Sequence, residues 1–253
     1  MPTQDLTERT AKGLPAPPVL SLGKAALFLD LDGTLAPLSA RPQDVGPETR
    51  RNDLLVRLQA ALGGRLAVLS GRTLEDIDRI LEGKVVAVAA IHGLVRRGPD
   101  GVVHRSEPHP ALPGVVARLR AFAAGQPGLI VEDKGLSATL HYRQAPGMAA
   151  AVRRLTLAIA TETGLTLQHG AMVEELRTPG STKGDSLCAF LEQQPFAGAR
   201  PVFLGDDDTD EHGFQAAQGL GGLGVLVGPA RPTEACRGLT DVGAALDWLE
   251  ASL

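Results

Sequence analysis

Apolar residues recur with two different periods in the first hundred residues of the chain. Short apolar runs predict strands over 25–29, 65–70 and 85–91. Between these runs, apolar residues spaced three and four apart predict amphipathic helices over 47–62 and 73–82. Strands that alternate with helices are typical of a parallel sheet covered by helices.

The pattern changes after this region. Residues 94–105 predict a hairpin around the turn GPDG. Two predicted helices follow, each succeeded by two short strands with tight connections, and consecutive strands of this kind pair antiparallel. In chain order these segments are helix 111–124, strands 129–133 and 137–143, helix 147–163, and strands 165–168 and 172–177. We therefore expect an inserted α+β domain, of αββαββ order, over residues 106–179.

The alternation of helices and strands resumes after the insert. Strands are predicted over 201–205 and 224–228, and helices over 183–194, 210–218 and 243–250. Residues 1–105 and 180–253 are thus expected to form one α/β core with a parallel sheet, which the insert interrupts.

A glycine pattern near the C-terminus resembles a dinucleotide-binding fingerprint. Gly219, Gly221 and Gly224 have the spacing Gly-x-Gly-x-x-Gly. Such a site needs a strand before the glycines and a helix after them, and here the predicted order is reversed. We therefore interpret these glycines as a turn.

Composition narrows the classes of function. The net charge is −4 and no basic run occurs, so a nucleic-acid partner is not expected. Residues 1–18 contain no apolar segment, which predicts a loose leader and no signal peptide. The longest apolar run, residues 85–91, is too short to span a membrane. We expect a cytoplasmic monomer without a membrane partner.

The composition also indicates what fills the interior. Hydrophobic residues make up 43% of the chain and aromatic residues only 3%, so the core is predicted to be aliphatic. Cys188 and Cys236 lie far apart and match neither a disulfide nor a zinc pattern. Both are predicted to be small residues that fill the core.

Acidic residues directly follow two of the predicted strands. Asp30 and Asp32 come after strand 25–29, and four aspartates lie within residues 206–210, after strand 201–205. Ligands of open α/β sheets bind at the carboxyl ends of strands. Neighbouring like charges need a counter-charge, and carboxylate oxygens suit Mg²⁺. A single Asp-x-Asp is as readily a solvated turn, but two such clusters in one chain favour a metal-assisted site.

Two further features suit a phosphate group. Ser70 ends the predicted strand 65–70, and its hydroxyl and the N–H groups of Gly71 and Arg72 can hold phosphoryl oxygens. Lys183 opens a predicted helix, where its ammonium can hold another oxygen. Either feature alone is common at protein surfaces, but their order and their placement at a strand end and a helix start favour a phosphate site.

Together these motifs resemble the haloacid dehalogenase superfamily of phosphatases. The four parts are DLDGT from Asp30, the serine of SGR, the lysine of STKGD and the acidic run GDDDTD from Gly205. Residues 24–250 resemble, more narrowly, the trehalose-6-phosphate phosphatase family, in AIHG, EELRTPGSTKG and above all VEDKGLSATLHYR. Thr178 stands where that family usually has proline. The resemblance implies a Rossmann-like haloacid dehalogenase core, an inserted cap domain and a trehalose 6-phosphate substrate.

The resemblance also implies a role for each motif residue. Asp30 would attack phosphorus to form an aspartyl-phosphate, and Asp32 would act as acid and then as base. Mg²⁺ would be bound by Asp30, the backbone carbonyl of Asp32, and Asp206. Asp207 would join through water, Asp210 would orient Lys183, and Asp208 would be solvated or cap a helix. The sugar contacts are expected from Glu132, Lys134 and Glu175 in the insert, which would close over the core on hinges near 107–110 and 177–180.

Two alternatives stay open at this point. The substrate of a phosphatase of this kind can be another disaccharide or glycosyl phosphate. A sugar-phosphate sensor or phospho-receiver without turnover would also have an acidic pocket, a hydroxyl residue and a lysine. A receiver does not need a second acid two residues after its nucleophile, so Asp32 favours the enzyme.

Overall fold

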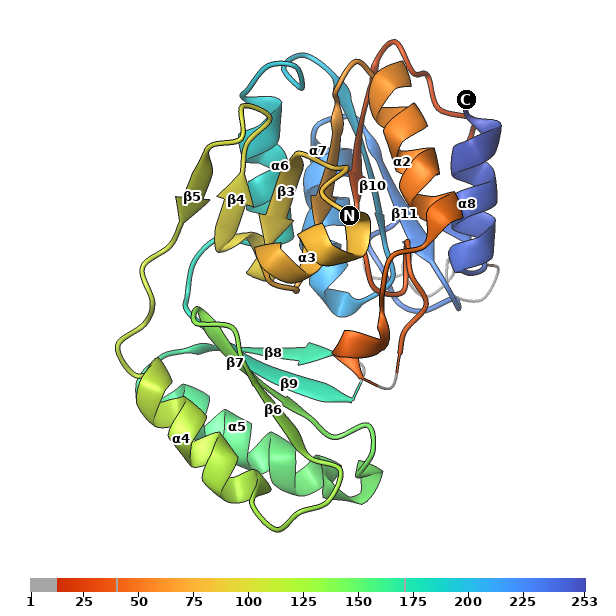
Figure 1. Ribbon diagram of the computed structural model, residues 1–253. Helices are drawn as coiled ribbons and strands as arrows, with labels where there is room; N and C mark the ends of the chain where they lie inside the picture. The colour runs from red at the N-terminus through yellow and green to blue at the C-terminus, as the bar shows by residue number, and fades with distance from the viewer. Residues whose placement is uncertain (1–12, 40, 171) are drawn as a thin grey trace. The chain divides into compact units, whose positions relative to one another are not determined.

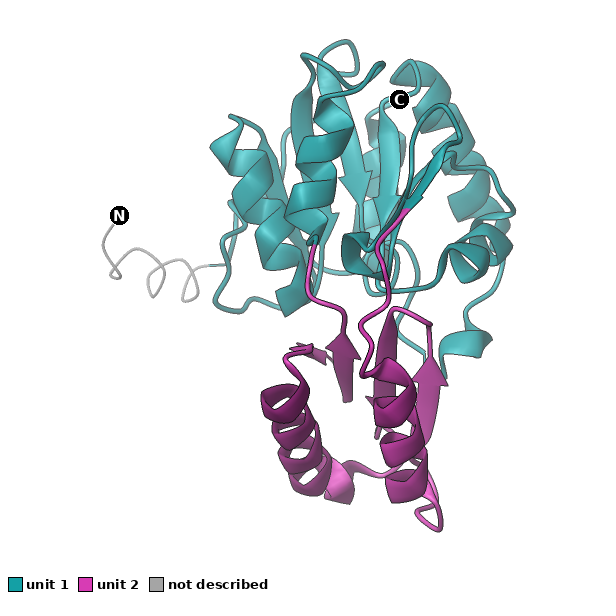
Figure 2. Cartoon of the chain, turned by 90° about the vertical axis from the view of Figure 1, so that its left-hand side faces the viewer, with its two compact units in different colours: residues 1–104, 181–253 teal, residues 105–180 magenta. Residues whose placement is uncertain are grey.

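The computed structural model describes residues 13–39, 41–170 and 172–253, which form two compact units. Unit 1 comprises residues 1–104 and 181–253, and unit 2 comprises residues 105–180 (Figure 2). The boundaries expected for the insert, residues 106 and 179, each lie one residue inside unit 2.

Unit 1 is built on an eight-stranded sheet in the order β12-β11-β10-β1-β2-β3-β4-β5 (Figure 1). The strands from β12 to β3 pair in parallel, and β4 turns antiparallel to β3. Their bounds are β1 (Ala25–Leu29), β2 (Leu66–Leu69), β3 (Ala87–Ala90), β4 (Val95–Arg97), β5 (Val103–Arg105), β10 (Arg200–Gly205), β11 (Leu223–Val227) and β12 (Arg237–Leu239). The predicted α/β core with a parallel sheet is confirmed.

Helices cover both faces of this sheet (Figure 1). The helices α6 and α7 pack on one face, and α2, α3 and α8 lie on the other. Their bounds are α2 (Thr49–Ala61), α3 (Leu74–Leu81), α6 (Lys183–Leu191), α7 (Glu211–Gly219) and α8 (Val242–Ala251), with 3-10 turns η1 (Pro42–Asp44), η2 (Ile91–Gly93) and η4 (Asp208–Asp210). Such crossover helices are what a parallel sheet requires, because its strands cannot be joined by tight turns.

Two predictions made from composition, an aliphatic core and buried cysteines, are wrong for unit 1. Its layer beneath α6 and α7 gathers five of the six phenylalanines of the chain, so it is not purely aliphatic: Phe28, Phe190, Phe196, Phe203 and Phe214. Both cysteines are free, but Cys188 is exposed and Cys236 is only partly buried, so neither fills the core. Aromatic rings are few, and concentrating them in one layer lets them pack edge to face and stacked.

Two shorter segments also bear on the sequence analysis. The three glycines of the dinucleotide-like pattern lie where α7 passes into β11: Gly219 ends α7, Gly221 lies in the turn, and Gly224 lies in β11, so a helix precedes them and a strand follows, as the sequence predicted. The first part of the predicted leader, residues 1–12, lies outside the described residues. Its remainder is not loose, because Gly238 N–H donates to the carbonyl of Pro15 and Trp248 Nε1–H to that of Pro18. Residues 13–18 therefore run along the core.

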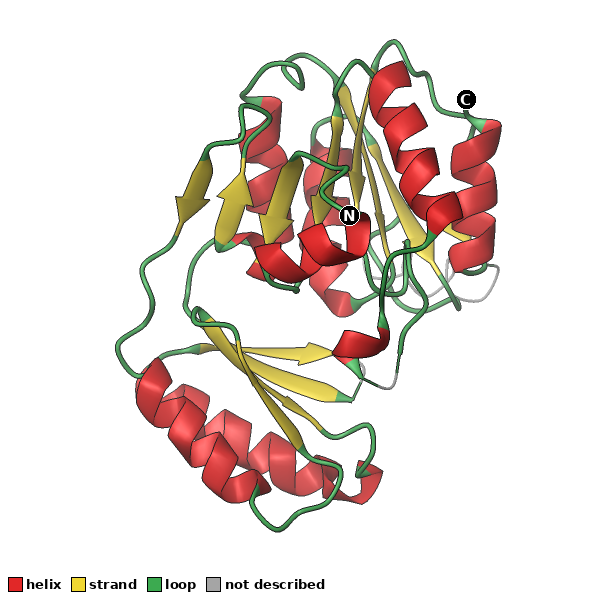
Figure 3. Cartoon of the chain, viewed as in Figure 1, coloured by secondary structure: helices red, strands yellow, loops and turns green. Residues whose placement is uncertain are grey.

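Unit 2 is a four-stranded antiparallel sheet with two helices on one face (Figure 3). Leucine, valine and isoleucine side chains of the helices and alternate strand residues fill the space between. The elements are α4 (Leu112–Ala123), β6 (Ile130–Asp133), β7 (Ser137–His141), η3 (Pro146–Met148), α5 (Ala149–Thr163), β8 (Thr166–Gly170) and β9 (Val173–Arg177). The opposite face of the sheet is not covered by α4 and α5. In the described part of the chain, no helix has the length and apolarity to cross a membrane.

Candidate active site

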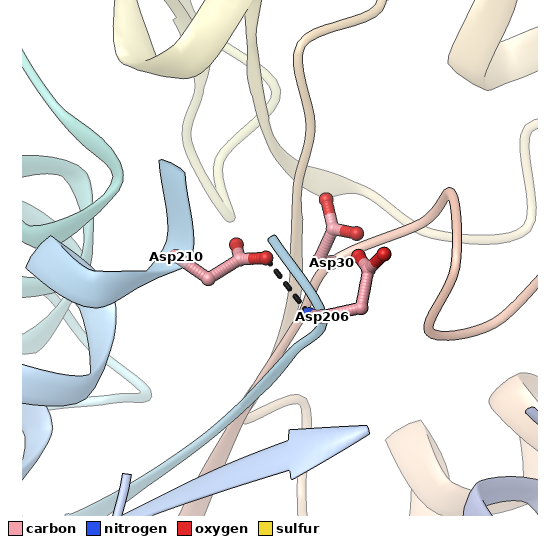
Figure 4. A group of neighbouring side chains, drawn as sticks. All are labelled: Asp30, Asp206 and Asp210. Carbon is pink, nitrogen blue, oxygen red and sulfur yellow. Dashed lines mark hydrogen bonds between the residues drawn. The ribbon is translucent and has the colours of Figure 1, made fainter. Parts of the chain in front are cut away.

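The two acidic clusters meet because the strands that precede them are neighbours. β1 and β10 pair in parallel with Leu29 opposite Leu204, and the Asp30 N–H donates to the Leu204 carbonyl at 2.9 Å. Both strands therefore end at the same edge of the sheet. One carboxylate oxygen each of Asp30, Asp206 and Asp210 lies within 4.8 Å of the others (Figure 4).

Lys183 joins the two clusters. Its Nζ donates to Asp30 Oδ1 at 2.7 Å and to Asp210 Oδ1 at 2.6 Å. The lysine opens α6, whose start is set by a capping box between Thr182 and Asp185. Its side chain is 2% exposed, and a buried ammonium needs such carboxylate partners. The capped helix end therefore fixes where the ammonium lies.

Asp210 shapes the loop that carries the second cluster. Its Oδ2 accepts the N–H groups of Asp206 at 3.0 Å and Asp207 at 3.1 Å, while Oδ1 accepts from Lys183. Both oxygens are thus engaged with the protein, and the side chain is fully buried. Asp210 therefore accepts hydrogen bonds from the Lys183 ammonium and from two backbone N–H groups of its own loop. Asp208 is solvated, with a side chain 78% exposed.

The carboxylates are held in an environment that disfavours their charge. Burial raises the pKa of the Asp30 carboxyl well above its ordinary value, opposed by Lys183 and assisted by Asp210 and Asp206. Burial and the charge of Asp210 raise the pKa of Asp206 to about 7, and burial also raises that of Asp207. Burial alone would lower the pKa of Lys183, but Asp210 and Asp30 outweigh it and raise that pKa.

The donor set fits a divalent cation. Three carboxylates and one ammonium leave a surplus of about two negative charges when all are ionised. A small cation of two positive charges would balance that surplus and take oxygen ligands. Gly33 leaves room beside Asp206, since a β-carbon on residue 33 would lie 2.0 Å from Asp206 Oδ2. Asp30 and Asp206 are the carboxylates best placed to bind such an ion, because Asp210 is occupied.

The Ser70 loop follows β2, the next strand of the sheet. The Ser70 N–H donates to the Ala89 carbonyl at 2.8 Å, and the Arg72 N–H donates to Ser70 Oγ at 3.3 Å. The Arg72 side chain turns to Asp32, with Nε to Oδ2 at 2.7 Å and Nη2 to Oδ1 at 2.8 Å. From the sequence, only the backbone N–H of Arg72 was expected to take part in the site. The pairing of its side chain with Asp32 was not predicted, because no local pattern connects residues 40 positions apart.

A strained turn after β3 supports the same loop. Ile91 and His92 have φ of 47° and 55°, a conformation that is rare outside glycine and costly for a β-branched residue. Their N–H groups donate to the carbonyls of Arg72 and Ser70, both at 2.9 Å. The His92 ring packs on Gly71, where an added β-carbon would lie 2.4 Å from Nε2. These contacts clamp the Ser70 loop, and the sequence analysis assigned no role to them.

Unit 2 carries the three residues that the sequence analysis expected to contact sugar. Glu132, Thr139, Glu175 and Gln168 lie opposite one another across all four strands. They point away from α4 and α5, because the alternate residues Ala138, Leu140 and Leu176 fill the core under the helices. Lys134 Nζ donates to Glu175 Oε1 at 3.3 Å, and His141 Nε2 lies 2.9 Å from Glu132 Oε2. Sequence analysis missed Thr139, Gln168 and His141, which share this face.

Known proteins of similar sequence settle the family. The family model described as trehalose-phosphatase matches residues 28–236. The chain belongs to the trehalose-phosphatase family. It is 38% identical over 230 residues to a probable trehalose-phosphate phosphatase of Sinorhizobium fredii, covering 90% of this chain and 87% of that protein. It is 37% identical over 233 residues to trehalose-6-phosphate phosphatase of Escherichia coli, covering 90% of this chain and 86% of that one.

Solved structures agree on the fold. The C-terminal domain of Candida albicans trehalose-6-phosphate phosphatase superposes with a TM-score of 0.82 at 20% identity, covering 95% of this chain and 98% of that domain. The same fold occurs in a phosphatase of the haloacid dehalogenase superfamily and in a haloacid dehalogenase-like hydrolase, both of Bacteroides thetaiotaomicron. The predicted haloacid dehalogenase core and the resemblance to the trehalose-phosphatase family are therefore confirmed.

Proposed function

We propose that this member of the trehalose-phosphatase family hydrolyses trehalose 6-phosphate to trehalose and inorganic phosphate, with Mg²⁺ as its metal. The observation that carries the proposal is the lysine-bridged cluster of Asp30, Asp206 and Asp210 at the carboxyl ends of β1 and β10. It combines a nucleophile, a fixed cation and oxygen ligands for a metal in one place. Hydrolysis of a phosphate monoester is so slow without catalysis that enzymes accelerate it by up to about 10²¹-fold.

Asp30 is the proposed nucleophile. One oxygen attacks phosphorus, the bond from phosphorus to the sugar oxygen breaks, and an aspartyl-phosphate forms. Lys183 holds Asp30 Oδ1 at 2.7 Å, so the carboxylate is fixed in orientation before substrate arrives. The ammonium also neutralises part of the repulsion between a carboxylate and a phosphate dianion.

Asp32 is the proposed acid and base. Protonated, it gives its proton to the leaving sugar oxygen; ionised, it then takes a proton from the water that attacks the aspartyl-phosphate. A positioned acid or base of this kind contributes about 10²–10⁴-fold to rate. Ser70 Oγ and the N–H of Gly71 are the proposed contacts to the other phosphoryl oxygens.

Asp30, Asp206 and the backbone carbonyl of Asp32 are the proposed ligands of Mg²⁺, with Asp207 joining through water. When bound, the ion supplies charge neutralisation for the phosphoryl group. Asp210 keeps Lys183 and the backbone of Asp206 and Asp207 in place through three hydrogen bonds.

The sugar is, we propose, recognised by the polar face of unit 2. A non-reducing disaccharide offers hydroxyl groups and no charge beyond its phosphate. Carboxylates accept from pairs of hydroxyls, and an ammonium donates to hydroxyl or ring oxygens. Glu132, Glu175 and Lys134 supply those groups on one face. Unit 2 would thus act as the cap that selects the substrate.

A phosphate-release assay tests this function. Trehalose 6-phosphate, sucrose 6-phosphate, glucose 6-phosphate and an aryl phosphate are compared with Mg²⁺ and with chelator. We expect trehalose 6-phosphate to have the highest kcat/KM, and chelator or Asp30→Asn to abolish turnover. Asp208→Asn is the matched control, since this exposed aspartate of the same loop should be dispensable. A higher kcat/KM for another disaccharide phosphate would reassign the substrate, and no release from any would favour a sensor.

A further inference from the structure

Arg72 grips both oxygens of the Asp32 carboxylate. Nε donates to Oδ2 at 2.7 Å and Nη2 donates to Oδ1 at 2.8 Å, a side-on geometry with two parallel bonds. The arginine side chain is 9% exposed and that of Asp32 is 30% exposed. Water therefore reaches the carboxylate while the guanidinium behind it stays largely excluded from solvent.

The guanidinium is itself anchored on its far side. Nη1 donates to the Pro42 carbonyl at 2.9 Å and also to the carboxylate of Asp76 in the first turn of α3. Asp76 is held in turn by Arg79 through an Nε bond of 3.0 Å. Arg72 thus links Asp32 to α3 and to η1, two elements outside the loop that carries Asp32.

These contacts leave the guanidinium little capacity for a phosphate. Four of its five N–H groups are used by Asp32, Pro42 and Asp76. Binding a phosphoryl oxygen with this side chain would break at least part of the grip on Asp32. The geometry favours a role that acts through Asp32 over direct contact with the phosphate.

We propose that Arg72 is a positioning residue, which fixes the plane and rotamer of the Asp32 carboxylate so that it is aligned with the leaving oxygen of the substrate. The proposal rests on the acid role given to Asp32 under the proposed function. An aspartate side chain has two rotatable bonds. A planar guanidinium that is itself held by Pro42 and Asp76 restricts both rotations before substrate binds. Lysine cannot replace it, because an ammonium makes no bidentate contact of fixed plane.

The test compares two substrates in Arg72→Lys. A sugar phosphate needs its leaving oxygen protonated, whereas an aryl phosphate with a good leaving group does not. We compare kcat/KM, which reports the transfer of the phosphoryl group to Asp30 and not the later attack of water that both substrates share. For trehalose 6-phosphate it should fall on the order of 10–100-fold, a part of what an acid contributes, and for the aryl phosphate it should stay within about twofold. Inhibition by inorganic phosphate should be unchanged. Equal loss on both substrates with weaker phosphate inhibition would show that Arg72 binds phosphate, and unchanged kinetics would also overturn the proposal.

A matched control and a second variant keep the result interpretable. Arg97 also makes a bidentate contact, through Nη1 and Nη2, with Asp78 of α3, and both N–O distances are 2.7 Å. Arg97→Lys should leave the kinetics of both substrates unchanged. Asp76→Asn weakens the anchor of Arg72 without touching Asp32, and it should give the same substrate-selective loss, smaller in size, even if Arg72→Lys does not fold. Loss on both substrates, or on neither, in Asp76→Asn would count against the proposal.

Asp32→Asn separates the failure of this proposal from the failure of the proposed function. If Asp32 is the acid, Asp32→Asn lowers kcat/KM for trehalose 6-phosphate more than kcat/KM for the aryl phosphate, and adding Arg72→Lys to it produces no further selectivity. A selective loss in Asp32→Asn but not in Arg72→Lys overturns only the positioning role. Equal loss on both substrates in Asp32→Asn overturns the acid role itself, and the positioning role with it.

Discussion

Gly33 and Asp206 approach so closely that a β-carbon on residue 33 would lie 2.0 Å from Asp206 Oδ2. The backbone of Gly33 also has φ of +83°, a left-handed conformation that other residues adopt only under strain. Both constraints act on the loop between the proposed nucleophile and the proposed metal ligand. The site therefore has room for only a hydrogen at this position.

Gly33→Ala should remove activity. The methyl group must displace the Asp206 carboxylate, so we expect kcat/KM to fall at least about 100-fold, as misplacement near the reacting atoms does. Backbone strain should add about 1–2 kcal/mol of lost stability. Gly83→Ala is the control, because Gly83 has φ of +66° and a β-carbon added there would point into open space. It should lose similar stability and keep its activity. Full activity in Gly33→Ala would mean that Asp206 is dispensable where it now lies.

Asp206 should make the stability of the metal-free protein depend on pH. Its pKa is raised by folding from 3.8 to about 7, so the folded state binds more protons than the unfolded state between these values. Stability from this group is therefore present below about pH 4 and is lost as pH rises towards 7. In chelator at pH 8, Asp206→Asn should be more stable than the unmutated protein, on the order of 1–3 kcal/mol. The difference should shrink towards pH 5.

Thermal unfolding with and without Mg²⁺ completes this test. Because the metal competes with the proton for Asp206, Mg²⁺ should raise the Tm of the unmutated protein more at pH 8 than at pH 6. The gain should be small in Asp206→Asn at both values. Asp208→Asn, with its exposed carboxylate, should behave like the unmutated protein. A pH-independent gain would mean that Asp206 is not a ligand.

Glu132→Gln and Glu175→Gln should reduce turnover of trehalose 6-phosphate selectively. Each change weakens a charge-assisted hydrogen bond to a sugar hydroxyl, worth about 1.5–3 kcal/mol, which corresponds to roughly 10–100-fold in kcat/KM. A small aryl phosphate has no sugar to contact, so its turnover should be retained. Glu162→Gln is the control, because Glu162 pairs with Arg118 on the helical side of unit 2. Loss on both substrates would assign the two glutamates to folding.

Thr178→Val should loosen the two segments by which the chain enters and leaves unit 2. Thr178 Oγ1 accepts the His109 N–H at 3.1 Å, which joins the expected hinges directly. Valine keeps the shape and removes the acceptor, at a cost of about 1 kcal/mol. We expect faster limited proteolysis at 105–110 and 178–181, scored by mass spectrometry. Thr161→Val, which removes an exposed helix hydroxyl bonded to Leu157, should leave the cleavage rate unchanged. An unchanged cleavage rate in Thr178→Val would show that this hydrogen bond does not hold the two hinge segments together.

Much of the fold follows from local pattern. The apolar runs that became β1, β2, β3, β10 and β11 are short, continuous and separated by amphipathic helices, which forces parallel pairing. The three-residue β12 was missed, because Arg237–Leu239 has no apolar run and is a strand only by pairing with β11. The cysteines were misplaced for a related reason: the burial of Cys188 in α6 and of Cys236 before β12 depends on which side of each segment meets a neighbour, and composition carries no such information.

In the candidate site, too, some features follow from local sequence and others depend on the folded chain. Local sequence was enough to predict that Asp30 and Asp206 would meet, since carboxylates that end parallel neighbouring strands must lie at one edge of the sheet. It also placed Glu132, Lys134 and Glu175 on the two hairpins of the insert, but their common role was expected only from the family resemblance. The partner of each carboxylate, by contrast, depends on the folded chain. Asp32 meets Arg72 across 40 residues, a pair that was not expected, and Asp210 meets Lys183 across 27 residues, a pair that only the family resemblance implied. Side-chain partners of this kind are set by the packing of separate elements, which has no signature in local sequence.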